Sequence, residues 1–122
     1  CVVPREHGPQ VVREMLAEIA REGAGSFLAV LKQWGDLRSP GLVSFPLPGV
    51  SLALDFAQHD AINRRLFARL DALVDGAGGR LYPAKDAHMS APHFQKAYPA
   101  WRDVEALRDP AIESQFWSRV TA

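Results

Sequence analysis

The sequence predicts an α+β fold of the ferredoxin-like class: an antiparallel sheet with two helices on one face, followed by extra C-terminal helices. Two observations support this prediction. Strand-length apolar runs and amphipathic helices follow one another in the order β-α-β twice, over residues 1–32 and 50–86. The motif Gly-Ala-Gly also occurs twice, at residues 23–25 and 76–78, each time between a helix and a strand.

The composition is that of a single globular domain. The 122 residues are 48% hydrophobic and 23% charged, which is enough to bury a core. Lys plus Arg and Asp plus Glu number 14 each, so no charge excess indicates nucleic acid or an anionic membrane as a partner. No apolar run is long enough to span a bilayer. Cys1 is the only cysteine, which excludes an internal disulfide.

The first residues, Cys-Val-Val-Pro, have the pattern of a strand already under way, without an initiator methionine or a signal peptide. We therefore expect the chain to be a piece of a longer protein. Pro9 suits the first turn of the helix that follows. Its apolar residues recur at helical spacing: Val12, Met15, Leu16 and Ile19. Residues 26–32 are then expected to form a buried strand, because the run is short, apolar and bounded by glycine.

Residues 33–49 are rich in glycine and proline and predict a loop. The segment is long for a connection inside a compact domain. Such a loop is typical of a lid or a partner-facing segment, and a merely mobile insertion fits the pattern equally well.

The second unit repeats the first. Residues 50–56 predict a strand and residues 60–74 an amphipathic helix, which Gly76 closes. Within residues 76–86, the short apolar run after the glycines predicts the last strand, which Pro83 prevents from donating further hydrogen bonds. Lys85 and Asp86 follow at the end of that predicted strand. Lys85 stands at the same offset from its glycine motif as Lys32, so we expect the two lysines at related sheet positions.

From residue 91 to 122 the pattern is helical, with breaks at Pro99 and Pro110. This segment carries aromatic residues that we expect to be exposed and to pack on a missing domain: Phe94, Tyr98, Trp101, Phe116 and Trp117.

One face of the predicted sheet collects the candidate site. Side chains alternate along a strand, so Val30 and Lys32 share a face, as do Ser51, Ala53 and Asp55. The small residues Ser51 and Ala53 leave room for a ligand, and they also suit packing against another domain.

A resemblance sharpens this hypothesis. Residues 78–86 read Gly-Gly-Arg-Leu-Tyr-Pro-Ala-Lys-Asp, and Tyr98-Pro99, Asp109-Pro110, Ser114 and Arg119 follow at matching places. Together with residues 26–32 and 48–56, this pattern resembles the C-terminal part of FAD-linked oxidases of the vanillyl-alcohol-oxidase type. The nearest branches are decaprenylphosphoryl-ribose oxidase and D-arabinono-1,4-lactone oxidase.

The resemblance implies a C-terminal substrate domain that lies over the flavin of FAD, which an N-terminal domain outside this chain holds. It assigns Lys85 to catalysis and to the cofactor, and Tyr82 to the cofactor. It assigns four residues to the substrate side: Val30, Lys32, Ser51 and Ala53. The implied reaction oxidises a hydroxyl of a sugar, sugar lactone or polyprenyl-phosphate sugar, in a protein that is cytoplasmic or associated with a membrane through a lipid-linked substrate.

The chain also departs from both branches. The mycobacterial decaprenylphosphoryl-ribose oxidases carry Asn and Cys where this chain has Ser51 and Ala53. The aldonolactone oxidases favour a His-Trp pair where this chain has Tyr82 and Pro83. The substrate therefore remains open.

The four histidines lack ligand spacing, so we expect no metal site. A second function class fits the periodicity equally well: a free-standing ferredoxin-like module that binds a small ligand or assembles with a partner. We further expect the chain by itself to bind no FAD and to self-associate through exposed apolar surface.

Overall fold

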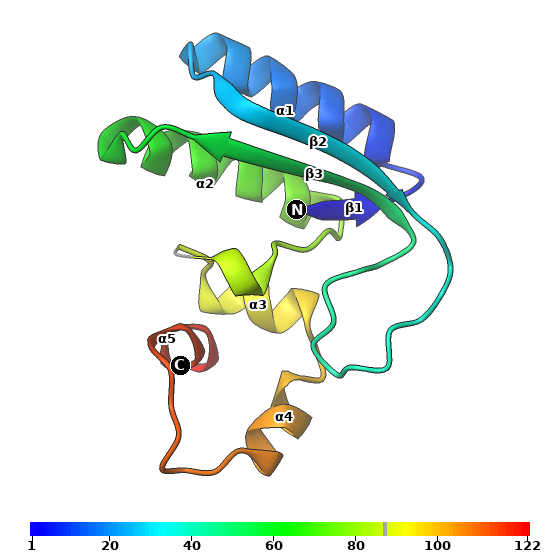
Figure 1. The fold of residues 1–122 in the computed structure, drawn as a ribbon, viewed down its shortest axis with the longest axis vertical. Coiled ribbons are helices and arrows are strands. Elements are labelled where there is room, and N and C mark those ends of the chain that lie inside the picture. The colour runs from blue at the N-terminus through cyan, green and yellow to red at the C-terminus, as the bar shows by residue number, and fades with distance from the viewer. Residues whose placement is uncertain (87) are drawn as a thin grey trace.

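The computed structural model describes residues 1–86 and 88–122 and confirms the α+β class. Figure 1 shows the long helices α1 and α2 beside the sheet, with the short helices α3, α4 and α5 gathered apart from them. The sheet and its helices are β1 (Val2–Pro4), α1 (Gly8–Glu22), β2 (Ser26–Trp34), β3 (Gly49–Phe56) and α2 (Asp60–Gly76). The C-terminal part holds a 3-10 helix, η1 (Pro83–Lys85), and the helices α3 (Ala91–Ala97), α4 (Trp101–Leu107) and α5 (Gln115–Thr121).

The sheet is antiparallel with strand order β1-β3-β2. Arg80 adds an antiparallel bridge on the free side of β1, where its N–H and C=O each pair with Val2 at 2.8 Å. Including this bridge, the order of the elements agrees with a ferredoxin-like arrangement.

The last predicted strand is wrong in extent, because residues 78–86 contribute only the bridge at Arg80. Arg80 and Val2 exchange both of their main-chain hydrogen bonds, so the next carbonyl, that of Leu81, faces away from β1. It accepts a 2.6 Å hydrogen bond from the Tyr98 hydroxyl. Pro83, which has no N–H, then begins the 3-10 helix η1. Lys85 therefore lies on a short turn and not at a strand end.

Helices α1 and α2 cover one face of the sheet and enclose the larger apolar cluster, which we call the sheet core. Its buried residues are Val3, Val11, Met15, Ile19, Leu52, Leu66, Leu70 and Val74. In α1 the buried face follows Val11 and not Val12, and Leu16 is half exposed. Glu22 of α1 pairs with Arg65 and Arg69 of α2, which joins the polar sides of the two helices and lowers the pKa of Glu22.

The glycine-rich stretch after α2 has a packing function. Gly78 has a left-handed backbone with φ of 69°. A Cβ on Gly79 would lie 2.6 Å from the carbonyl oxygen of Val2 and 2.8 Å from a methyl carbon of Val74. Glycine at position 79 therefore lets the chain approach β1 closely enough for the Arg80 bridge.

The strand predicted at residues 26–32 is confirmed as β2, but the predicted burial of its side chains is wrong. Among the described residues, β2 lies at the edge of the sheet and has β3 as its one strand neighbour. Its large apolar side chains are exposed, at 86% for Phe27, 53% for Leu28 and 60% for Leu31. An apolar run identifies a strand, but it does not say whether this chain or another covers it.

The expectation of exposed C-terminal aromatic residues is also wrong. Phe94 and Tyr98 are fully buried with Met89 and Val120, in a second cluster that we call the C-terminal core. The remaining three predicted aromatics are partly buried against it: Trp101, Phe116 and Trp117. Ring contacts within this chain therefore account for the burial of Phe94 and Tyr98.

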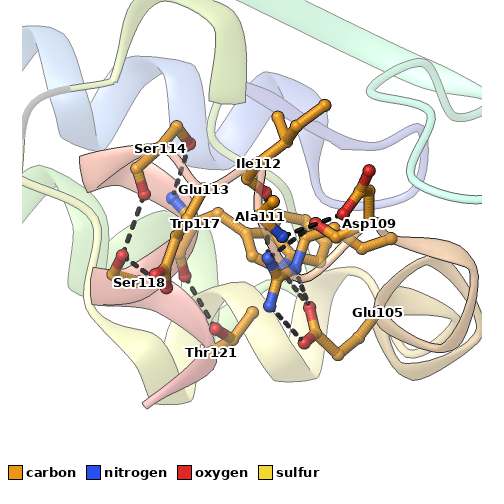
Figure 2. Close-up of polar contacts among 10 residues, drawn as sticks. Glu105, Asp109, Ala111, Ile112, Glu113, Ser114, Trp117, Ser118 and Thr121 are labelled. Carbon is orange, nitrogen blue, oxygen red and sulfur yellow. Dashed lines mark hydrogen bonds and ion pairs between the residues drawn. The ribbon is translucent and has the colours of Figure 1, made fainter.

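A polar cluster holds the last two helices together (Figure 2). The carboxylate of Glu105 on α4 accepts two 2.8 Å hydrogen bonds from Arg108 and another from the indole N–H of Trp117 on α5. These contacts lower the pKa of Glu105 to about 2, chiefly through Arg108. Ser114 caps α5 by accepting a hydrogen bond from the backbone N–H of Trp117 at 3.1 Å.

Within the described residues, none of the helices has the length and apolarity that crossing a membrane requires. The same part of the chain holds no group of three or more His, Cys, Asp or Glu residues arranged for a metal ion.

Candidate functional site

The open face of the sheet carries a hollow of ≈ 640 Å³. All six residues predicted from the sequence line it: Val30, Lys32, Ser51, Ala53, Tyr82 and Lys85. They come from β2, from β3 and from the segment around η1. The structure thus brings the candidate residues together, while their roles stay predictions.

The two strands form the floor of the hollow. Val30 lies opposite Ala53, and Lys32 lies opposite Ser51 in the β2–β3 register. Directly opposed residues point to the same face of a sheet, with Cβ atoms about 4.5–5.5 Å apart. Ser51 is only 7% exposed, whereas Lys32 is exposed. Ala53 adds little bulk, and the small floor residues make space beneath the lysine.

An aromatic wall that the sequence reasoning missed stands beside this floor. The ring of Phe45 lies 5.0 Å from that of Tyr82 and 6.4 Å from that of Trp34, in edge-on geometry. Trp34 could have been found, because it continues the alternation of Val30 and Lys32 on the same face. Phe45 lies in the connection between β2 and β3, where no periodicity places a side chain.

The connection of residues 35–48 is held against the sheet by two arginines. Arg80 donates to the carbonyl oxygens of Ser44 at 2.8 Å and Pro46 at 3.3 Å. The guanidinium of Arg80 also lies over the ring of Tyr98, 5.4 Å from its centre. Arg5 donates to the carbonyl oxygen of Trp34 and to Asp36, both at 3.3 Å.

Lys32 and Lys85 do not occupy related sheet positions, which corrects the expectation from the repeat. Lys32 is a residue of the edge strand β2, whereas Lys85 ends η1. Both line the same hollow, however, and none of its described lining residues is acidic. The hollow is therefore lined by two lysines and by three residues with hydroxyl groups, Ser44, Ser51 and Tyr82, beside an aromatic wall. This combination suits a flat ligand or an oxygen-rich ligand that carries negative charge.

A carboxylate follows the lysine directly. The side chain of Asp86 is only 2% exposed, and it pairs with Arg119 of α5. It also accepts hydrogen bonds from the backbone N–H groups of His88 at 3.0 Å and Met89 at 2.7 Å. The residue after Lys85 is thus fixed from two sides.

His88 links this segment to α2. Its Nε2 lies 3.0 Å from an oxygen of Asp71, and its ring stacks on Phe67 with ring centres 5.0 Å apart. The hydrogen bond with Asp71 raises the pKa of His88, against the opposing effect of burial. We assign this histidine to packing between the segment and α2, because it does not line the hollow.

The comparisons with known proteins agree with the resemblance in part. No family model matches the chain. The chain is 35% identical to decaprenylphosphoryl-beta-D-ribose oxidase of Mycolicibacterium smegmatis, over 89% of this chain and 24% of that protein. It is 33% identical to an uncharacterized protein encoded in the mprA 5' region of Streptomyces coelicolor, over 84% of this chain and 28% of that protein.

The chain thus spans about a quarter of the length of the curated relatives that it matches. It is a partial homologue of a protein named as an oxidase, and the matched part takes in most of the sheet and its helices.

Proposed function

We propose that this chain forms the substrate-facing part of an FAD-dependent oxidoreductase. One observation carries the proposal. Two lysines, a serine and an aromatic wall surround a single hollow, in a chain that is similar over most of its length to part of an oxidase. We further propose that the substrate is a hydroxyl of a sugar, sugar lactone or polyprenyl-phosphate sugar.

The residues present fit one side of a flavin. A hollow of ≈ 640 Å³ is within the range of about 300–1,000 Å³ typical of small-molecule sites. Tyr82 and Phe45 offer apolar ring surface, and Lys85 offers a positive charge near them. The glycines at positions 78 and 79 serve a turn and the contact with β1. We therefore assign the diphosphate of FAD to a separate, N-terminal domain of the longer protein.

In this proposal FAD supplies the acceptor for the two electrons that leave the substrate alcohol. The chain's own residues bind and orient the substrate. Lys32 on the rigid strand β2 and Ser51 opposite it hold substrate oxygens by hydrogen bonds. Lys85 supplies positive charge where negative charge develops, a preorganised electrostatic role. Val30 and Ala53 shape the apolar floor.

The test is Lys85→Ala in the full-length protein that contains this chain. One lost charge-assisted contact in a closed site costs about 2–4 kcal/mol, or roughly a hundredfold in rate. We expect anaerobic single-turnover reduction of the flavin by substrate to slow by that factor, with FAD still bound. Lys85→Arg should restore the rate only in part, because the guanidinium is wider and differently shaped.

Lys96→Ala is the matched control. This lysine pairs with Asp75 at 2.8 Å and does not line the hollow. Its removal should leave the rate unchanged. A Lys85→Ala rate within about twofold of wild type, by the same measure, would contradict the catalytic role.

One observation favours a second candidate function: all the residues that line the hollow belong to this chain. In that case the chain is a free-standing module that binds a small ligand without catalysis. Titration of the 122-residue chain with FAD tests whether the FAD-holding part lies outside this chain, as the first candidate requires. We expect no binding, because the diphosphate would lack its site, whereas tight binding by this chain would contradict the division of labour proposed here.

A further inference from the structure

The turn that carries Lys85 has little stability of its own. The helix η1 is three residues long, and its two closing hydrogen bonds, from Lys85 to Tyr82 and from Asp86 to Pro83, are both 3.3 Å. A short 3-10 segment has poorer hydrogen-bond geometry than an α-helix. The position of the Lys85 amine at the hollow must therefore depend on contacts from outside the turn.

The C-terminal helices supply these contacts on both sides of the turn. Before it, the Tyr98 hydroxyl on the C-terminal side of α3 donates to the Leu81 carbonyl at 2.6 Å. After it, Arg119 of α5 pairs with the buried Asp86 and donates to the Met89 carbonyl at 3.3 Å. The next residue of α5, Val120, is fully buried, which anchors the helix itself.

We propose that Asp86 and Arg119 are positioning residues for Lys85. Arg119 fixes the Asp86 carboxylate, and Asp86 fixes the backbone on which Lys85 is the preceding residue. Neither residue lines the hollow. The inference rests on the proposed function for its catalytic meaning, but its structural content concerns this chain alone.

The lysines offer a direct readout, because the chain has only three: Lys32, Lys85 and Lys96. Reductive methylation with ¹³C-formaldehyde gives each of them a separate NMR signal, assigned by single Lys→Arg variants. In Arg119→Gln we expect the signal of Lys85 to move and to sharpen as its backbone is released. The signals of Lys32 on β2 and of Lys96, which pairs with Asp75, should keep their wild-type positions.

Three further variants make the test specific. Arg119→Lys restores a positive charge opposite Asp86 and should return the Lys85 signal part of the way. Asp86→Asn keeps an acceptor for the N–H groups of His88 and Met89 but loses the ion pair, so it should reproduce Arg119→Gln. Arg102→Gln removes a charge from α4, where the arginine lies over the ring of Trp101, and should have no effect on Lys85.

An unchanged Lys85 signal in a folded Arg119→Gln chain would overturn the proposal. Loss of all three native signals in both Arg119→Gln and Asp86→Asn would also overturn it, because the pair would then serve folding as a whole. In the full-length protein, Arg119→Gln should slow flavin reduction by up to about a hundredfold, the cost of a misplaced catalytic group. It should add nothing to Lys85→Ala.

The two hypotheses fail separately. If Lys85→Ala leaves the rate unchanged, the catalytic role of Lys85 falls, whereas the NMR result on the turn stands. If the NMR signal of Lys85 ignores Arg119, the positioning role falls, whatever the kinetics of Lys85→Ala.

Discussion

The sheet core and the C-terminal core are built differently. The sheet core consists of aliphatic side chains and methionine, closed between a sheet and two helices of 15 and 17 residues. The C-terminal core is centred on the aromatic rings of Phe94 and Tyr98, and its three helices have seven residues each. Helices this short are marginal without tertiary contacts, so the second region depends on its rings and on polar anchors such as Glu105.

Leu81 packs against both cores. It directly precedes Tyr82, and the turn with Lys85 follows, so one wall of the hollow lies at the junction of the two regions. The comparison teaches that the hollow requires both: the sheet core sets the strand floor, and the C-terminal core sets the position of the turn.

The largest effect on stability should come from removing the ring of Phe94 from the C-terminal core. Phe94→Ala deletes a fully buried aromatic side chain, a change that costs about 3–5 kcal/mol. Hydrogen exchange should then show loss of protection in α3 and α5 with protection kept in α1 and β3. Leu66→Ala, in the sheet core, is the matched comparison and should cost about 2–5 kcal/mol with loss of protection throughout. Equal loss everywhere in Phe94→Ala would mean that the two regions unfold as one unit.

A smaller effect should follow from separating β1 from the segment that leads to the turn. Gly79→Ala places a Cβ 2.6 Å from the Val2 carbonyl oxygen, and such overpacking costs about 1–3 kcal/mol. Gly76→Ala is the control, because a Cβ there has nothing within 4 Å and the residue is helical. The control should stabilise the chain by about 0.4–1 kcal/mol. Urea denaturation midpoints measure both; equal midpoints would exclude the close approach at Gly79.

The smallest effect should be the pH dependence of the link between α2 and the segment after the turn. The pKa of His88 is raised from 6.5 by Asp71, with Asp86 and Arg119 also near it. The folded state therefore favours the charged form of His88 more than the unfolded state does. Its stabilisation is complete below pH 6.5 and is lost as the pH rises through the higher folded-state pKa.

For a half-exposed pair this loss should be about 0.2–1 kcal/mol. The measurement is the free energy of unfolding against pH, as the difference between wild type and His88→Gln. A difference that does not decrease as the pH rises would contradict the charged pair.

Much of the fold follows from the sequence because periodicity reports local structure well. The helix α2 and the strands β2 and β3 begin and end within two residues of their predicted ranges. Whether β2 is buried could not be predicted in the same way, because a strand covered by a helix and a strand at an open edge can have the same apolar sequence pattern. The predicted final strand was wrong in extent because the chain leaves the sheet after Arg80 and Pro83 begins a 3-10 helix.

In the candidate site too, local patterns predicted some residues, whereas others depend on contacts between distant parts of the chain. The alternation of side chains predicted that Val30 shares a face with Lys32, and Ser51 with Ala53. The strand register then places the two pairs beside each other on the same face of the sheet. The equal offset of Lys85 and Lys32 from their glycine motifs predicted related sheet positions, which is wrong, whereas the resemblance placed Lys85 with the other candidate residues. Phe45 and Arg119 act through contacts more than 30 residues away in the chain, which no local pattern reveals.

The loop of residues 35–48 has a consequence for how proteins built this way can diverge. Arg80 holds it by two main-chain carbonyl oxygens, which every loop sequence possesses. The loop's side chains, including the ring of Phe45, can therefore be exchanged without loss of the attachment, and even a doubled length costs only about 0.6 kcal/mol in closure entropy. Substitutions in this one surface loop can thus reshape the hollow without changing the lysines or the fold that carries them.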